Sequence, residues 1–192
     1  MKNLVIGFAL CGSFCTYQKA MASLEKVAAA YKTVIPIFSQ SGWETDTRFG
    51  DAVQHIRRAE EICGTAALHT VAQVEPIGPK KLLDALVIAP CTGNTLAKLA
   101  HGIADGPVTM AAKSHLRNGR PIVLAVSTND GLGTAAENIG RLLARKHIFF
   151  VPFGQDSPEK KPTSLVADFE KLPQALELAL EEKQLQPLLI SD

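Results

Sequence analysis

The chain has 192 residues, 46% of them hydrophobic and 20% charged, with a formal net charge of +1 at pH 7. This composition is that of a globular protein, and the small charge excludes long-range attraction to nucleic acid. The length suffices for one full hydrophobic core, so we expect a single domain over residues 1–192. No apolar run approaches the roughly 20 residues that cross a bilayer, and residues 4–10 lack the flanks of a signal peptide. We therefore expect a cytoplasmic protein with no membrane contact.

Five apolar runs have the length and composition of buried parallel strands. They lie at residues 4–10, 34–38, 86–89, 122–126 and 148–151. Stretches with helical periodicity alternate with them, at about 14–30, 51–63, 95–104, 108–117 and 135–145. This alternation predicts an α/β fold, a three-layer Rossmann-like or flavodoxin-like parallel sheet with helices on both faces.

Three segments depart from the alternation. Residues 39–50 are polar and contain Trp43 and Arg48, so we expect a loop over one edge of the sheet. Residues 70–83 contain two prolines and a glycine, which predicts an irregular crossing with one short strand. From about residue 164 we expect a C-terminal helix that runs to Lys183, followed by an extended tail to the end of the chain.

The first strand-like run ends in Cys11-Gly12-Ser13, just before a helical stretch. Gly12 lets a ligand approach the backbone closely, and Ser13 is a natural N-cap with a spare hydroxyl. Unpaired N–H groups and the positive end of a helix make such a turn suitable for a phosphate. The turn is neither Gly-x-Gly-x-x-Gly nor a P-loop, so a mononucleotide phosphate fits better than a pyrophosphate. Ser39, after the next run, is expected to face the same cleft, although a simple turn residue explains it equally well.

A second polar loop, residues 90–95, joins the run at 86–89 to another helical pattern. Open α/β sheets bind ligands where a strand ends and a helix begins. Thr92, Asn94 and Thr95 offer hydroxyl and amide groups at this position. The alternative is an ordinary strand-to-helix turn with Asn94 as its N-cap.

Together the two loops resemble the flavoprotein family that includes phosphopantothenoylcysteine decarboxylase, lantibiotic cysteine decarboxylases and flavin prenyltransferases. In that family a Gly-Ser turn holds the FMN phosphate, and a Pro-Ala-Ser-Ala-Asn-Thr segment contacts the flavin. The chain matches this segment at Pro90, Asn94 and Thr95. Of the family's later Pro-x-Met-Asn-x-x-Met-Trp motif only Asn129 remains. Pro76 stands where the decarboxylases carry a catalytic histidine, so their machinery is missing and no catalytic residue is assigned.

A second resemblance covers nearly the whole chain and is to the B-subunit family of bacterial dipicolinate synthase. The segments that carry it are residues 12–17, 47–50, 75–80, 89–94, 126–130, 149–156 and 185–187. Members of that family work with a separate A subunit, a dehydrogenase-like protein that carries NAD(P). The resemblance implies that the pair converts dihydrodipicolinate to dipicolinate in the cytoplasm of the sporulating cell. By analogy with the decarboxylases, we expect a homotrimer or a multiple of one.

The resemblance also implies an FMN site at the strand ends, where a phosphate or sulfate ion would bind when FMN is absent. The expected cofactor-binding residues are Gly12, Ser13, Ser39, Thr92, Gly93, Asn94, Thr95 and Ser127. A dicarboxylate substrate needs cations or several N–H donors, and Arg48 and Asn129 are the candidates. A loop anchor paired with Asp46 or Asp51 explains Arg48 equally well.

No metal site is predicted, because the four cysteines, Cys11, Cys15, Cys63 and Cys91, follow no zinc spacing. We expect reduced thiols, as in most cytosolic proteins. Cys91 lies in the proposed ligand loop, where a helix N-terminus would lower its pKa. The histidines nearest in sequence to the expected catalytic position, His55 and His69, are interpreted as surface residues.

Three functions follow from these patterns. The favoured one is a subunit of a two-component oxidoreductase that forms dipicolinate. The second is a non-catalytic scaffold on a flavin-binding fold, and the third is a stand-alone FMN-dependent decarboxylase or prenyltransferase. The sequence leaves open whether FMN is bound and whether this chain contributes catalytic groups.

Overall fold

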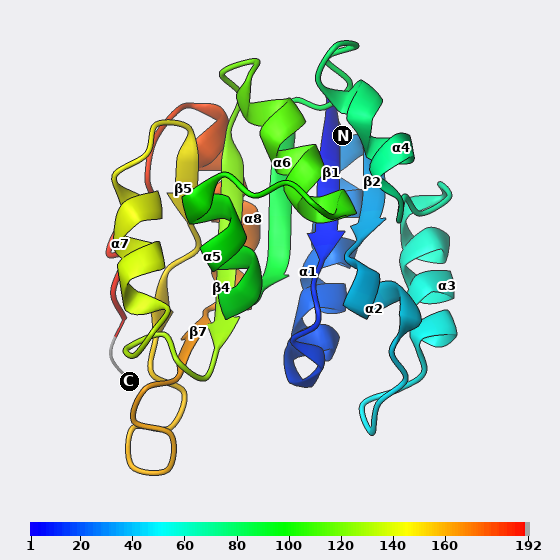
Figure 1. Cartoon of the computed structure of the whole chain (residues 1–192). Coiled ribbons are helices and arrows are strands. Elements are labelled where there is room, and N and C mark those ends of the chain that lie inside the picture. The colour runs from blue at the N-terminus through cyan, green and yellow to red at the C-terminus, as the bar shows by residue number, and fades with distance from the viewer. Residues whose placement is uncertain (191–192) are drawn as a thin grey trace.

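The computed structural model describes residues 1–190, which form a seven-stranded, mainly parallel sheet between two layers of helices (Figure 1). The strand order is β2-β1-β3-β4-β7-β6, and β5 also pairs with β4. The strands are β1 Lys2–Leu10, β2 Tyr31–Phe38, β3 Ala85–Cys91, β4 Ile122–Thr128, β5 Ile148–Phe150, β6 Phe153–Gly154 and β7 Leu165–Ala167. The pairings among β1 to β5 are parallel, whereas β7 is antiparallel to β4 and to β6. The predicted α/β fold is confirmed.

Helices cover both faces of the sheet. One layer holds α4, α5, α6 and α7, and the other holds α1, α3 and α8 (Figure 1). Their bounds are α1 Tyr17–Ala30, α2 Gln40–Glu44, α3 Ala52–Cys63, α4 Val71–Val74, α5 Gly93–His101, α6 Pro107–Leu116, α7 Ala136–Leu143 and α8 Leu172–Leu180. Three 3-10 turns complete the chain, η1 Phe14–Thr16, η2 Glu75–Ile77 and η3 Phe169–Lys171. No helix in residues 1–190 is both long and apolar enough to cross a membrane.

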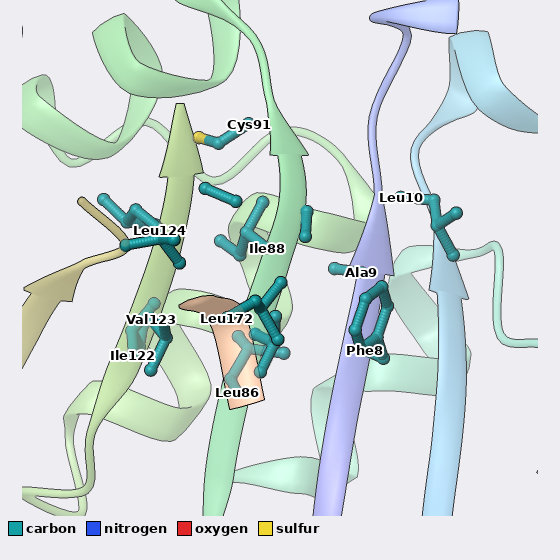
Figure 2. Close-up of a cluster of buried hydrophobic side chains, with 14 of the residues drawn as sticks. Phe8, Ala9, Leu10, Leu86, Ile88, Cys91, Ile122, Val123, Leu124 and Leu172 are labelled. Atoms are coloured by element: carbon teal, nitrogen blue, oxygen red, sulfur yellow. The ribbon is translucent and has the colours of Figure 1, made fainter. Parts of the chain in front are cut away.

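The core lies where the two helical layers meet the central strands. Every residue of β3 is buried, because helices cover this strand on both faces. Leu86 and Ile88 of β3 pair with Ile122 and Leu124 of β4, and Leu172 packs in from α8 (Figure 2). Each fully buried side chain of this size stabilises the fold by about 1.5–3 kcal/mol. The sheet therefore gives the loops at its edge a rigid support.

The strand order places a topological switch point at the site. From β1 the chain crosses to β2 on one side and later to β3 on the other, so the loops that follow β1 and β3 diverge from adjacent strands. Open α/β sheets bind their ligands in the crevice that this reversal creates. The turn at Gly12 and the loop at Thr92 border that crevice.

Three expected segments differ from the structure. Residues 70–83 contain α4 and η2 and no strand, because Thr70 and Gln73 form a capping box that starts a helix. Residues 39–50 are not loop throughout, since α2 begins immediately after Ser39. The C-terminal helix begins only at Leu172, and β7 precedes it. The tail is without regular structure up to residue 190, with one bridge between Phe153 and Leu189, and its last two residues lie outside the described part.

Candidate functional site

The carboxyl ends of β1, β3 and β4 open into one cleft with a volume of about 930 Å³. Its base, which we name the strand-end floor, consists of Gly12, Ser13, Thr92, Gly93, Asn94, Ser127 and Asn129. Charged side chains surround it, and we name Lys19, Arg48, Asp130, Asp156 and Lys161 the charged rim. A smaller cavity of about 410 Å³ adjoins the cleft and shares Thr92 and Asn94 with it.

The Gly12-Ser13 turn is tighter than the sequence suggested. The Ser13 N–H donates to the Cys11 carbonyl at 2.8 Å, so this amide is not free for an anion. The Ser13 hydroxyl lies 2.8 Å from the Ser127 hydroxyl, and Thr16 Oγ1 lies 3.2 Å from Ser127. Ser13 does not cap a helix with its side chain, because η1 intervenes before α1 begins at Tyr17. A chain of hydroxyls thus ties the end of β1 to the end of β4.

Gly12 lies against Ser41, a serine that the sequence patterns did not indicate. A Cβ added at Gly12 would lie 2.7 Å from Ser41 Oγ, and Ser41 Oγ lies 3.1 Å from Ser39 Oγ. Ser39 caps α2 by accepting from the Gly42 N–H, and it lines the smaller cavity rather than the larger cleft. Ser41 therefore connects the two predicted phosphate-binding positions, Gly12 and Ser39.

The loop after β3 is organised by Thr92 and not by Asn94. Thr92 is the N-cap of α5, and its hydroxyl accepts from the Thr95 N–H at 3.2 Å. The alternative with Asn94 as the N-cap is wrong, because α5 already begins at Gly93. Asn94 lines both cavities, and its side-chain amide makes no hydrogen bond within residues 1–190. It is an unpaired polar group of the floor.

Gly93 is required by close packing. An added Cβ would lie 2.7 Å from Thr128 Oγ1 and 2.9 Å from Asp130 Oδ1. Thr128 donates its hydroxyl to Asp130, which fixes this carboxylate beside the loop. The loops after β3 and β4 therefore approach each other too closely for any side chain at position 93.

Arg48 lines the cleft. Neither expected partner holds it: Asp46 accepts from the Ala52 N–H, and Asp51 accepts from Gln54. The guanidinium lies over the Phe49 ring, 4.9 Å from its centroid. The interpretation of Arg48 as a loop anchor is thus wrong, and the side chain forms no ion pair with another described residue.

Burial keeps the thiols of Cys11 and Cys91 neutral. Cys11 is buried, which raises the pKa of its thiol to about 11. Burial likewise raises the pKa of Cys91 well above its usual value. The expected lowering at Cys91 is wrong, because desolvation outweighs the nearby helix N-terminus. Neither group supplies a thiolate at neutral pH.

The two histidines are part of the packing and do not line either cavity. His55 packs edge-on against Tyr17, with 4.8 Å between ring centroids, and burial lowers its pKa. His69 stacks on Trp43, with 3.6 Å between centroids and 4° between planes. Both are half-buried rather than exposed on the surface. No group of three or more potential metal ligands is found in residues 1–190.

Comparison with known proteins identifies the family of the chain. The family model described as Flavoprotein matches residues 2–168. The chain belongs to the Flavoprotein family. The B subunit of dipicolinate synthase from Bacillus subtilis (strain 168) is 45% identical over 192 residues, which cover 100% of this chain and 96% of that protein. Within the Flavoprotein family, the chain therefore groups with the B subunits of dipicolinate synthase.

Solved structures of Flavoprotein relatives have the same fold. The dipicolinate synthase B subunit from Bacillus halodurans superimposes with a TM-score of 0.91 at 43% identity, covering 100% of this chain and 98% of that one. DmrB from Burkholderia xenovorans, solved in complex with FMN, gives a TM-score of 0.68 at 18% identity, covering 93% and 96%. The second likeness shows the fold alone.

Sequence patterns located most of this Flavoprotein cleft but not the whole of its rim. Of the ten predicted site residues, eight line the larger cleft, while Ser39 and Thr95 lie in the smaller cavity. The residues not predicted include Lys19, Asp130, Asp156 and Lys161 of the charged rim, and Ser41 of the smaller cavity. Asp130 directly follows Asn129 in the sequence, and Ser41 lies two residues after Ser39, so proximity to predicted residues could have indicated both. No local pattern indicated Asp156 or Lys161.

Proposed function

We propose that the chain is the B subunit of a two-component oxidoreductase, which forms dipicolinate from dihydrodipicolinate during sporulation. The observation that carries this proposal is the 45% identity over the full chain to the dipicolinate synthase B subunit of Bacillus subtilis. A cleft with both neutral donors and cations is suited to a cofactor together with a dicarboxylate. The partner is a separate dehydrogenase-like A subunit, and the pair acts in the cytoplasm.

The residues present fit FMN. The Gly12 backbone and the hydroxyls of Ser13, Ser39 and Ser41 form a neutral cradle for its phosphate, since a Cβ at Gly12 would fill the approach. The polar groups available to the flavin ring are those of Thr92, Gly93, Asn94, Thr95 and Ser127. Asn94 is suited to a ring heteroatom because its amide has no partner among residues 1–190. FMN bound there would supply an acceptor for a pair of electrons.

The proposed reaction removes one hydride and one proton from the dihydropyridine ring and leaves an aromatic pyridine. FMN, if held by the floor residues, or NAD(P) on the A subunit would supply the hydride acceptor, and the proton would be released to solvent or to a base. Arg48 binds one substrate carboxylate, because its guanidinium has no other ionic partner among residues 1–190 and offers a bidentate fork. Asn129, at the end of β4, donates its side-chain amide to the substrate. These residues orient the ring against the floor.

The assembly proposed for this chain is a homotrimer or a multiple of one, together with the A subunit. The designation of its relatives as B subunits supports a partner chain. DmrB is described as a cubic protein cage, which supports self-association in this fold.

The experiment that tests the function uses the purified chain and the A subunit, separately and mixed, with dihydrodipicolinate as substrate. Pyridine formation is followed by absorbance together with NAD(P) reduction. We expect the mixture to turn over at a rate that neither protein reaches alone. Full activity of the A subunit alone would contradict the proposal.

A scaffold function is the second candidate, since no acid–base histidine lines the cleft and Pro76 stands in its place. The same preparation distinguishes it. A chain that stays colourless in excess FMN, but binds the A subunit tightly, would favour the scaffold. Carbon dioxide release from a peptidyl-cysteine substrate would instead favour a decarboxylase.

A further inference from the structure

The loop between β6 and β7, residues 155–164, carries two charged members of the rim. Lys161 Nζ lies 2.9 Å from Asp156 Oδ2, and both side chains line the cleft. The loop extends below the sheet edge at which the parallel strands end (Figure 1). Its charged pair thus reaches the cleft from a part of the fold that contributes nothing to the floor.

The loop is ordered by its own hydrogen bonds. The Lys161 N–H donates to the Ser157 carbonyl at 2.7 Å, and the Gln155 side chain donates to the Pro162 carbonyl at 2.8 Å. Thr163 Oγ1 donates to the Asn129 carbonyl at 2.7 Å, which attaches the loop to the end of β4. The loop that carries Lys161 is therefore attached to the end of β4 through Thr163 and Asn129.

The rim's ionic pairing is uneven. Lys161 is paired with Asp156, whereas Lys19 and Arg48 form no ion pair with any residue in 1–190. Burial raises the pKa of Asp156, but hydrogen bonds from Ser164 and Lys161 outweigh it and leave the pKa below its usual value. Asp156 is thus an anion at neutral pH, and its carboxylate is already paired with Lys161, one of the cations of the cleft.

We propose that Lys161 binds the second carboxylate of a dianionic substrate, and that Asp156 is the internal carboxylate which the substrate replaces. The proposal rests on the proposed function, which makes the substrate a small dicarboxylate. Arg48 holds one carboxylate and Lys161 the other, from two different loops. When the substrate carboxylate replaces Asp156, Lys161 remains paired with a carboxylate. The Asp156 side chain, which is already 30% exposed, then turns to water. Asp156 therefore competes with the second carboxylate of a dianion and lowers its affinity. A ligand with one carboxylate, held by Arg48, has no second group to replace Asp156 at Lys161, so it binds less tightly than a dicarboxylate.

The test is calorimetric titration of the full chain with pyridine-2,6-dicarboxylate and with pyridine-2-carboxylate. We expect Lys161→Gln to weaken dicarboxylate binding about tenfold and monocarboxylate binding less than about threefold, the scale of a charge-assisted hydrogen bond. Asp156→Asn is expected to strengthen dicarboxylate binding about threefold, because it removes the competing charge and keeps the shape. Lys160→Gln is the matched control and is expected to change nothing, since Lys160 is exposed and lies outside the cleft.

The outcomes separate this inference from the proposed function. Wild-type chain that binds the dicarboxylate, with Lys161→Gln binding equally well, overturns the role of Lys161 and leaves the function standing. Weaker binding of the dicarboxylate by Asp156→Asn than by the wild-type chain overturns the proposal that Asp156 competes with the substrate. Wild-type chain that binds neither pyridine carboxylate overturns both the inference and the substrate site.

Discussion

The strand-end floor and the charged rim border the same cleft but are built in opposite ways. The floor comes from a parallel sheet buried on both faces, and it offers hydroxyls and the side-chain amides of Asn94 and Asn129. The rim comes largely from loops, and it offers lysine, arginine and aspartate side chains with substantial exposure. The strand-end floor is thus neutral and rigid, whereas the charged rim is exposed to solvent.

The contrast indicates a division of tasks. Neutral hydrogen-bond donors fixed on a buried sheet can bind a cofactor, and no charged side chain of the protein has to lose its hydration when the cofactor binds. Exposed cations act through solvent, so each contributes less and salt screens it. We therefore expect substitutions at floor residues other than Asn129 to act on the cofactor strongly and independently of salt. Rim substitutions are expected to act on the substrate weakly and with salt dependence.

The largest effect on ligand binding is expected at Gly12. In Gly12→Val, the added branches would fill the approach to the backbone, where a Cβ already lies 2.7 Å from Ser41 Oγ. We expect FMN affinity, measured by flavin fluorescence, to fall by about a hundredfold, or about 2.7 kcal/mol. Gly140→Ala in α7 is the control, because its Cβ would meet no heavy atom within 4 Å. Unchanged FMN binding by a folded Gly12→Val variant would show that the cradle lies elsewhere.

His115 of α6 is a buried side chain that is held in its neutral form. Its side chain is buried, Nε2 lies 3.1 Å from the Pro121 carbonyl oxygen, and burial lowers its pKa to about 4. As the pH falls, the His115 imidazole of the unfolded chain is protonated before that of the folded chain, because its pKa is higher. The contribution of His115 to the free energy of unfolding is therefore complete above pH about 6.5 and declines as the pH falls toward about 4. The expected loss is about 3 kcal/mol.

Urea unfolding at a series of pH values measures this loss. His115→Gln keeps a donor for the Pro121 carbonyl and removes the titration, so its stability is expected to vary less between pH 6.5 and 4. His101→Gln, at the exposed end of α5, is the control and is expected to follow the wild type. Identical pH profiles for wild type and His115→Gln would mean that His115 is not held neutral.

Ser13 tests the hydroxyl chain of the floor. Ser13→Ala is expected to weaken FMN binding by about 1–2 kcal/mol, the scale of a hydrogen bond to a charged group. Ser127→Ala is expected to act similarly, and the double variant to lose less than the sum, because the two hydroxyls bond each other at 2.8 Å. Strict additivity in fluorescence titrations would contradict a shared network.

Arg48 gives the smallest effect of the four. Arg48→Gln is expected to weaken pyridine-2,6-dicarboxylate binding about fivefold, or about 1 kcal/mol, and to lose most of this effect in high salt. FMN affinity is expected to stay the same. Arg57→Gln, on the exposed part of α3, is the control. A large, salt-independent loss of FMN binding in Arg48→Gln would break the distinction between floor and rim.

Local sequence patterns were sufficient for the floor because its parts are consecutive in the chain. Apolar runs predicted the strands, and the polar residues after each run, such as Gly12 and Asn94, lie at the shared edge. The rim depends on long-range placement. Lys161 reaches the cleft only because β7 pairs antiparallel with β4, and a three-residue strand inside an apparently helical region gives no distinct periodicity.

Two errors in the segment from Cys91 to Asn94 have local physical causes. Asn94 and Thr92 are both good capping residues, and only the position at which α5 begins decides between them. The pKa of Cys91 depends on burial, which a motif does not reveal, and burial outweighs the helix N-terminus. Sequence therefore locates polar groups at strand ends more reliably than it assigns their hydrogen bonds or their charge.

The central claim is that the strand-end floor, with Ser39 and Ser41, binds FMN. Titration of the purified wild-type chain with FMN, followed by flavin absorbance and fluorescence, tests it most directly. We predict saturation at one FMN per chain, with a shifted flavin spectrum and with competition by inorganic phosphate. A folded chain that remains colourless after excess FMN and desalting, and leaves flavin fluorescence unchanged, would contradict it.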